Sequence, residues 1–466
     1  MQRFLKKTHK KKVIIIGGGP AGLTSAHELS KVGVESIVLE KDHTVGGIAR
    51  TINYKNYYFD IGGHRFFTEI KRVEDMWKEI LGNDLLRCQR LSRIYYNKKF
   101  FYYPLKPFQV LLGLGIWNSF MIIASYLYAR IFPSKSEETF EQWITNRFGK
   151  RLYTIFFKAY TEKVCGIPCS EIRAQWAEQR INGLSLLSAL RSFLAKSPNT
   201  GTGKTIIKTL IDNFYYPRLG PGMMWQAVAN IVQNNSSQVR LGAEVEGVLC
   251  TKNKIEALEV RHNGQKELVH GTHFISSMPL RELIHKFKPP VPEKVHKAAS
   301  ALAYRDFLTV ALIVDKRDVF QDNWIYIHEP SIKLGRIQNF KNWSSHMVPD
   351  QDKTCLGLEY FCFEGDELWR MTEQELIELG KSELSILGLV DARDIEDGFV
   401  VRMPKAYPIY DSRYQESLRI IYEFISQIDN LQLVGRNGLH KYNNQDHSML
   451  SAMRAVENIL GENNDL

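Results

Sequence analysis

The sequence predicts an α/β fold, and three observations near its N-terminus carry that prediction. Residues 12–16 form a β-branched run that is typical of a buried strand. The run leads directly into Gly17-Gly18-Gly19-Pro20-Ala21-Gly22, and a helical pattern covers residues 24–31. A second strand at residues 35–39 then ends in Glu40. This order of strand, turn, helix and strand predicts a Rossmann-like domain at the start of the chain.

The composition indicates a globular protein with more than one domain. The chain has 466 residues, of which 44% are hydrophobic and 24% are charged, and its net charge is +10. Part of that charge lies in a lysine-rich run at residues 6–12, which we expect to be a solvated tail. The remaining excess favours anionic ligands, such as nucleotides, or an anionic membrane surface. No basic stripe alternates with aromatic residues, so we expect no nucleic-acid partner.

The cysteines indicate neither a metal site nor a disulfide framework. They are scattered along the chain, at Cys88, Cys165, Cys169, Cys250, Cys355 and Cys362. None forms a Cys-x-x-Cys pair or a zinc-like cluster with histidine. We therefore expect free thiols, no bound metal and a reducing, cytoplasmic location. No signal-peptide pattern precedes the first strand.

The glycine turn has the spacing that binds a dinucleotide. Gly17 permits a tight turn, Gly19 lets the backbone approach a diphosphate, and Gly22 lets helix and strand pack closely. The diphosphate would then lie at the helix N-terminus, where free N–H groups and the helix dipole favour anions. Glu40 would accept hydrogen bonds from ribose hydroxyls and would repel the 2′-phosphate of NADP.

Two further features favour FAD over NAD. Gly46-Gly47 and Arg50 follow the second strand, a pattern that is typical of flavoproteins with this fold, and the segment 433–460 resembles the C-terminal piece that covers their flavin. No second G-x-G-x-x-G lies between a strand and a helix, so reduction of the flavin would need an external donor such as NAD(P)H. The predicted FAD-binding residues are Gly17, Gly19, Pro20, Ala21, Gly22, Glu40, Lys41, Gly47, Ile48, Arg50, Gly62, Gly63, His64, Gly435, Arg436, Asp446, His447 and Ser448.

The full prediction is a GR2-type flavoprotein: a Rossmann-like FAD-binding domain with an interleaved helical subdomain and an antiparallel β-sheet substrate domain. Between residues 69 and 212 the pattern is mostly helical, with a possible capping box at Thr139 and Gln142 and a loop at 196–204. Further strands are predicted at 238–241, 256–261, 309–314, 324–328, 355–361 and 430–434, and a final helix at 447–460. The predicted domains are 1–70, 213–285 and 426–466 for FAD, 71–212 for the helical cap, and 286–425 for the substrate sheet.

One apolar segment points toward membranes. Residues 110–129 contain no charged side chain and are long enough to span a bilayer. Polar residues and two glycines dilute the segment, which favours a buried or amphipathic helix over a span. Peripheral membrane contact is a second interpretation, and the sequence indicates no particular oligomeric state.

Five motifs in the same order make the chain resemble the UDP-galactopyranose mutases, closest to the eukaryotic-type branch and related bacterial flavoproteins. The motifs are YFDIGGH at 58–64; ETFEQWITNRFG at 138–149, continued by FFKAYTEKVCGIP at 156–168; WIYIHEP at 324–330, followed by LGRIQNF at 334–340; AYPIYD at 406–411; and GRNGLHKYNNQDHSM at 435–449. Cys165 departs from the family, which commonly has tryptophan at that position.

The resemblance implies a redox-neutral reaction on a nucleotide sugar, UDP-galactose or similar, for surface polysaccharide biosynthesis. Reduced FAD would supply the N5 nucleophile, and the sugar would return to the diphosphate with a different ring size. Arg180 and Arg336 would bind the diphosphate, although either could be an ordinary salt-bridged arginine. The resemblance also assigns phosphate contacts to Tyr326, Tyr407 and Tyr442, whose alternative is a place in the core.

The same resemblance assigns His64, Arg180 and Arg336 to catalysis. His64 would contact the flavin, and its alternative is a structural histidine. Asp446 would bind the flavin, cap the last helix, or do both. Two other functions remain open: a net-redox oxidoreductase of the amine oxidase or protoporphyrinogen oxidase type acting on a sugar- or lipid-linked substrate, and a flavin-binding partner protein without catalysis.

Overall fold

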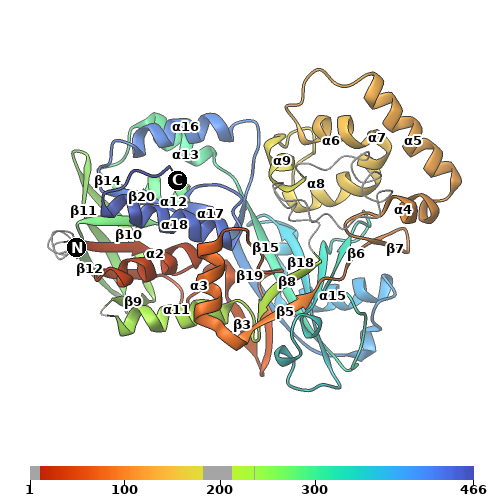
Figure 1. The fold of residues 1–466 in the computed structure, drawn as a ribbon, viewed down its shortest axis with the longest axis horizontal. Helices are drawn as coiled ribbons and strands as arrows, with labels where there is room; N and C mark the ends of the chain where they lie inside the picture. The colour runs from red at the N-terminus through yellow and green to blue at the C-terminus, as the bar shows by residue number, and fades with distance from the viewer. Residues whose placement is uncertain (1–10, 182–211, 236, 466) are drawn as a thin grey trace.

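A computed structural model describes residues 11–181, 212–235 and 237–465. Figure 1 shows a nucleotide-type lobe around β1, α2 and α18, a group of helices from α4 to α9, and a second large sheet that contains β15 and β18. The predicted loop at 196–204 lies outside the described residues. The predicted α/β class is confirmed.

A five-stranded parallel sheet forms the core of the first lobe. Its order is β20-β13-β1-β2-β9, with β1 in the centre. Val13, Ile14 and Ile15 of β1 are fully buried because helices or other strands cover both faces of the sheet. The strands are β1 (Lys12–Ile16), β2 (Glu35–Glu40), β9 (Gln238–Leu241), β13 (His273–Ser276) and β20 (Leu431–Leu433).

The helices α2 (Pro20–Lys31), α3 (Lys71–Leu81), α11 (Gly222–Asn234) and α18 (Gln445–Leu460) share one apolar core with this sheet. A separate sheet of order β12-β11-β10-β14 packs on its other side. That sheet contains β10 (Ala243–Thr251), β11 (Lys254–His262), β12 (Gln265–His270) and β14 (Phe287–Lys288). Near it lie α12 (Leu280–His285), α13 (Glu293–Ala301) and α16 (Tyr414–Ile425).

The second lobe is a seven-stranded sheet of order β19-β15-β18-β17-β16-β6-β7. All neighbouring strands are antiparallel except β6 and β16, which are parallel. The strands are β6 (Ser92–Tyr96), β7 (Lys99–Tyr102), β15 (Tyr304–Val314), β16 (Trp324–Ile327), β17 (Arg336–Asn339), β18 (Thr354–Cys362) and β19 (Ile395–Pro408). The strands predicted at 309–314, 324–328 and 355–361 coincide with β15, β16 and β18.

The segment 71–212 contains strands that the helical prediction did not include. Besides β6 and β7, β5 (Leu85–Gln89) pairs with β8 (Asn213–Pro217), and β3 (Thr51–Tyr54) pairs with β4 (Tyr57–Asp60) shortly before. The helices of this segment are α4 (Pro107–Leu114), α5 (Ile116–Ile131), α6 (Phe140–Phe148), α7 (Lys150–Leu152), a π-helix (Tyr153–Lys158), α8 (Ala159–Cys165) and α9 (Gln175–Ile181). The capping box of Thr139 and Gln142 at the start of α6 is confirmed.

The apolar segment 110–129 is divided between α4 and α5, which break at Gly115 with φ +82°. Among the described residues, no helix is both long and apolar enough to cross a membrane. All six cysteines are free thiols, as expected.

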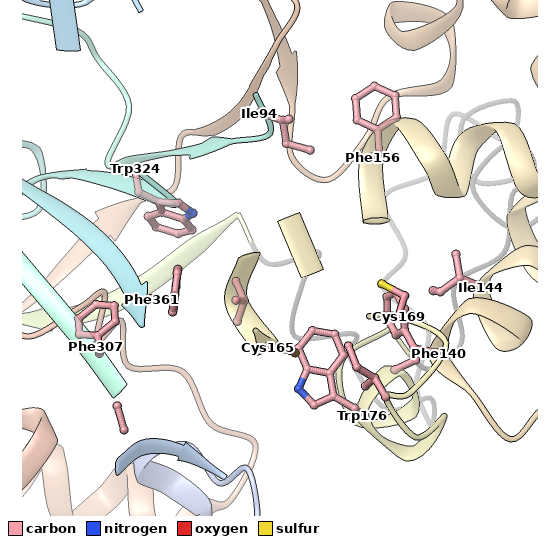
Figure 2. Close-up of a cluster of buried hydrophobic side chains, with 14 of the residues drawn as sticks. Ile94, Phe140, Ile144, Phe156, Cys165, Cys169, Trp176, Phe307, Trp324 and Phe361 are labelled. Carbon is pink, nitrogen blue, oxygen red and sulfur yellow. The ribbon is translucent and has the colours of Figure 1, made fainter. Parts of the chain in front are cut away.

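The helical group and the seven-stranded sheet share one apolar core. Figure 2 shows Phe140 and Trp176 from the helices in the same cluster as Phe307 and Trp324 from the sheet, with Cys165 between them. The remaining helices are α14 (Glu367–Arg370), α15 (Glu373–Ile386) and α17 (Gly435–Gly438), with 3-10 turns at Gly47–Ala49, Gly82–Asp84, Phe340–Asn342, Ser345–Met347 and Ala392–Asp394. Because of this shared core, the helical group is packed on the sheet as an integral part of one lobe.

A buried carboxylate joins three of these elements. Asp60 at the end of β4 accepts hydrogen bonds from the Tyr216 hydroxyl at 2.6 Å and from Thr51 Oγ1 at 2.8 Å. Its side chain is fully buried, and burial raises the pKa of Asp60 from 3.8 to about 7, although both hydrogen bonds act to lower it.

The raised pKa predicts how Asp60→Asn changes the pH dependence of stability. The folded state holds the proton more tightly than the unfolded state, so the contribution of Asp60 is greatest below about pH 4 and falls as pH rises to about 7. Each unit of difference between the two pKa values corresponds to about 1.4 kcal/mol. Urea unfolding of both proteins at about pH 5 and about pH 8 should therefore show that Asp60→Asn gains relative stability at the higher pH. An identical pH dependence in the two proteins would contradict the raised pKa.

Candidate active site

The first glycine turn closes so tightly that side chains are excluded. A Cβ atom on Gly22 would lie 1.9 Å from the carbonyl oxygen of Gly17, and Gly17 itself has φ +101°. The N-cap of α2 is Gly19, and within the described residues no side chain caps this helix end. Its first N–H groups therefore point toward space that suits a diphosphate.

Glu40 lies against the same turn, as predicted from its place after β2. Its carboxylate accepts hydrogen bonds from the backbone N–H of Gly18 at 2.6 Å and of Asp42 at 2.9 Å. Burial raises the pKa of Glu40, and these two hydrogen bonds oppose that shift. Lys41 is exposed.

The second glycine pair packs directly on the first turn. The N–H of Gly46 donates to the carbonyl oxygen of Gly18 at 2.8 Å, and a Cβ on Gly47 would lie 3.3 Å from Gly19 Cα. Arg50 contacts Asp42 through Nη1 at 2.5 Å. Its Nε is buried and makes no hydrogen bond to any described residue, so an acceptor such as a phosphate or ribose oxygen fits there.

The C-terminal segment reaches the same place. A Cβ on Gly435 would lie 2.9 Å from the Cβ of Ala21, and the N–H of Gly435 donates to Ser451 Oγ at 3.0 Å. Asp446 is buried in the first turn of α18, but the N-cap of that helix is Asn444. The capping role predicted for Asp446 is therefore wrong, because the helix begins two residues earlier than the predicted 447.

The rest of the predicted set lies around these contacts. Ile48 is half-buried in the 3-10 turn that follows Gly47, and Ser448 is buried in α18. The ring of His447 lies 3.8 Å from the Asp446 carboxylate. These positions make the FAD prediction geometrically consistent at the N-terminus of α2.

His64 comes directly after two glycines at which the chain, leaving β4, passes close to the large sheet. Gly62 has φ +89°, and a Cβ on Gly63 would lie 2.7 Å from Gln338 Nε2. The Nδ1 atom of His64 lies 3.1 Å from the carbonyl oxygen of Gly62. Burial and the nearby charges of Arg436 and Arg336 lower the pKa of His64 to about 3, so its imidazole is neutral at physiological pH.

Arg336 is held by a buried ion pair. Its Nε and Nη2 both donate to Oε2 of Glu359 at 2.6 Å, and Gln338 donates to the other oxygen at 2.7 Å. Burial acts to lower the pKa of Arg336, but the Glu359 carboxylate outweighs it and raises that pKa well above its ordinary value. The guanidinium is therefore a permanent cation, fixed in orientation.

Aromatic rings and further arginines surround Arg336. Its guanidinium lies 5.9 Å from the ring of Tyr326, which itself packs edge-on against Tyr103 at 4.9 Å and Tyr160 at 5.3 Å. Tyr407 and Tyr442 are stacked at 5.5 Å. The structure thus brings Arg336, Tyr326, Tyr407 and Tyr442 together, as the resemblance implied.

The sequence prediction missed four members of this cluster and assigned a fifth only to the cofactor. Arg436 lies 4.9 Å from the ring of Tyr442 and 5.3 Å from that of Tyr407. Arg65 lies 5.8 Å from the ring of Trp324, and Arg90 lies 5.4 Å from the same ring. Burial, followed by the charge of Arg90, lowers the pKa of Arg65 to about 10. The missed residues are Arg65, Arg90, Tyr103 and Tyr160.

Only Arg65 had a signal in the sequence, since it directly follows His64. Arg90 and Tyr103 flank strands that the sequence pattern did not reveal, and Tyr160 lies in a helical run of aromatic residues. Arg180 is in α9, and its side chain lies outside the described part of the structure.

A shallow pocket adjoins the cluster. It lies between the helical group, the end of β19 and the C-terminal segment, and it is mostly apolar. Its lining includes Cys165, Trp176, Arg305, Tyr407, Tyr410 and Tyr442. The cluster and the pocket together can hold a ligand with an anionic part and a flat or apolar part.

Known proteins resemble this chain in sequence and in fold. A sequence profile described as flavin containing amine oxidoreductase matches residues 20–460. The crystal structure of reduced UDP-galactopyranose mutase aligns with a TM-score of 0.84 and 21% identity, over 98% of this chain and 97% of that chain. This likeness establishes the shared fold.

Curated relatives match over shorter stretches. An uncharacterised protein of Methanothermococcus thermolithotrophicus is 49% identical over 53 residues, 11% of this chain and 51% of that protein. The 15-cis-phytoene desaturase of Synechococcus elongatus is 24% identical over 289 residues, 58% of each protein. The chain thus spans little more than half the length of these relatives.

The glycine geometry predicts the effect of Gly22→Ala. The new methyl group would collide with the Gly17 carbonyl and open the turn, so the purified protein should lose most of its bound flavin. Gly33→Ala is the matched control, because a Cβ there meets nothing within 4 Å although φ is +69°. That variant should be mildly destabilised and keep its flavin. Visible flavin absorbance per protein is the measurement, and equal flavin loss in both variants would contradict the assignment.

Proposed function

The chain belongs to the flavin-containing amine oxidoreductase family, and we propose that within this family it is a redox-neutral mutase of a nucleotide sugar, of the UDP-galactopyranose mutase type. The observation that carries the proposal is the half-buried arginine and tyrosine cluster around Arg336, next to His64. The family implies a flavin cofactor, and the contacts at the N-terminus of α2 suit FAD.

The charge of the cluster suits a diphosphate. Arg336 connects two groups of side chains: Arg65 with Tyr326 on one side, and Arg436 with Tyr407 on the other. Glu359 is the carboxylate that contacts Arg336. Arg336 and Arg436 both act on His64, and Arg336 also acts on Arg65, so several cations lie near one another in a site partly removed from water, where electrostatic interactions are strong. Planar guanidinium groups also match phosphate oxygens in pairs.

Each fixed group would orient the substrate. Two of the Arg336 donors engage Glu359, and no described residue bonds to Nη1, which is therefore available for a phosphate oxygen. Burial raises the pKa of Tyr160 and of Tyr407, so both phenols stay protonated and donate hydrogen bonds at neutral pH. The aromatic side chains beside this site, Tyr407, Tyr442 and Trp176, would contact the flat base of the nucleotide.

His64 would act as a neutral imidazole. With Nδ1 toward the Gly62 carbonyl, the other ring nitrogen is an acceptor that would face the cofactor or the sugar. When bound in its reduced form, the flavin would supply the nucleophile that displaces the diphosphate from the sugar. Arg336 and the tyrosines would hold that leaving group in place until the sugar is recaptured.

A net-redox reaction is the second candidate, favoured by the relatives that include a phytoene desaturase. A hydrocarbon substrate would offer Arg336 and the tyrosine hydroxyls no group that accepts a hydrogen bond, which is unfavourable in a polar site. A substrate that joins a lipid or sugar to a phosphate would satisfy them. The nucleotide-sugar mutase accounts for the whole cluster and is therefore the first candidate.

An assay of the dithionite-reduced protein separates the two candidates. Incubation with UDP-galactose and other nucleotide sugars should yield furanose product while the flavin stays reduced, because the mutase reaction transfers no net electrons. The product is followed by chromatography and the flavin by its absorbance. Turnover that is stoichiometric with flavin oxidation or reduction, or release of peroxide, would favour the second candidate.

Arg336→Ala should weaken UDP binding by about 2 kcal/mol, because a buried charged hydrogen bond is lost, and should leave the FAD content unchanged. Arg336→Ala also leaves the buried Glu359 carboxylate without its guanidinium partner. Arg336→Lys is therefore a companion variant that keeps a positive charge, and it should bind UDP with intermediate affinity. Calorimetric titration with UDP measures both.

Arg402→Ala is the control for these two variants. Arg402 lies on β19 of the same sheet, but it donates to the backbone carbonyls of Trp369 and Met371, away from the cluster. Its loss should leave UDP affinity intact. Unaltered UDP affinity in Arg336→Ala would reject the assignment of Arg336.

A further inference from the structure

The helices α4 and α5 expose an apolar surface that the proposed chemistry does not use. Sixteen large apolar side chains of the described residues are exposed, and eleven of them lie between residues 108 and 132. We call these eleven the hairpin face: Phe108, Leu112, Ile116, Trp117, Phe120, Met121, Ile123, Leu127, Tyr128, Ile131 and Phe132. Clusters of this kind on a protein surface mark an interaction site.

The helix α5 has an inner side and an outer side, and both are apolar. Ile122, Tyr126 and Ala129 are buried against the helical group, as expected for a surface helix. On the outer side, where such a helix normally carries polar residues, Ile116 is 92% exposed and Trp117 is 73% exposed. Leu112 of α4 is 83% exposed. Figure 1 shows both helices at the outer edge of the helical group.

The charged residues within this stretch of the chain have one sign. No aspartate or glutamate occurs between residues 94 and 136, whereas the stretch contains the exposed cations Lys98, Lys99, Lys106, Arg130 and Lys135. A polar pocket of ≈ 390 Å³ lies beneath the two helices and is lined by Lys99 and Arg151, among others. An apolar surface with a cationic rim complements a bilayer that contains anionic lipids.

We propose that the hairpin face binds peripherally to an anionic lipid bilayer, with the apolar side chains among the acyl chains and the basic rim at the headgroups. The break at Gly115 divides the apolar segment into two short helices, and neither is long enough to cross a membrane. Aromatic residues such as Trp117 and Tyr128 suit the boundary between headgroups and acyl chains. The protein lies on the membrane through this face.

The rim charges favour a bilayer over a second copy of this chain. Most symmetric dimers pair the same patch from each subunit, which here would bring cation against cation. Anionic lipid headgroups neutralise the same charges. The rim charges and the apolar side chains favour a bilayer whatever reaction the protein catalyses.

Vesicle flotation of the full-length flavoprotein tests the proposal. The protein should float with vesicles of phosphatidylglycerol and phosphatidylcholine, and binding should fall about tenfold on phosphatidylcholine alone. Ile116→Gln/Phe120→Gln/Leu127→Gln replaces three exposed apolar side chains and should also weaken binding at least about tenfold. Flavin absorbance of this variant should match the wild type, since these side chains make no contact with the cofactor region.

The matched control is Leu268→Gln/Ile386→Gln, because both residues are exposed apolar side chains on β12 and α15, away from the hairpin face. It should float as the wild type does. The proposal is overturned if the wild-type protein does not float or if the two variants bind vesicles alike. It is also overturned if light scattering shows a wild-type dimer that the triple variant converts to a monomer, because that result identifies the hairpin face as a self-association surface.

Discussion

Backbone contacts at the N-terminus of α2 constrain the whole nucleotide-type lobe. Residues 17–22, 46–50 and 435–436 meet there, although they are far apart in the chain. At Gly22, Gly47 and Gly435, an added Cβ would lie within 3.3 Å of an atom of residues 17–22, so the packing requires glycine at these positions. The same closeness leaves uncapped N–H groups facing a small volume bordered by Glu40 and Arg50. The glycines that allow this close packing are therefore the same residues that keep the helix N-terminus open to an anion.

A second buried contact connects the large sheet to this lobe. Glu359 on β18 orients Arg336 and Gln338 on β17, and Gln338 in turn lies against Gly63, directly before His64. A carboxylate that is fully buried must keep its partners, since an uncompensated buried charge is strongly destabilising. The position of His64 and the orientation of Arg336 therefore depend on the same side chain.

The parts of the fold with strong local patterns were predictable. The central strand at Lys12–Ile16, the glycine turn and the capping box at Thr139 follow from residue types a few positions apart, and the structure agrees with each. The strands at 85–102 were missed because they are short and because β6 pairs with β16, more than two hundred residues later. Arg90, between two of these strands, was missed for the same reason, whereas Arg65 was missed although it directly follows His64; contacts with Trp324 bring both into the cluster.

The placement of β1 has a consequence for how the chain is made. One neighbour of β1 in the sheet, β2, follows directly in the sequence, but the other neighbour, β13, lies about 260 residues later. The next strand, β20, is synthesised only near the end of the chain. A nascent chain on the ribosome therefore carries an apolar strand with one open edge during most of its translation. Such edges invite mispairing, and non-local pairing of this kind folds slowly. The organism that makes this protein would need to shield that edge, and expression without adequate chaperone capacity should yield inclusion bodies.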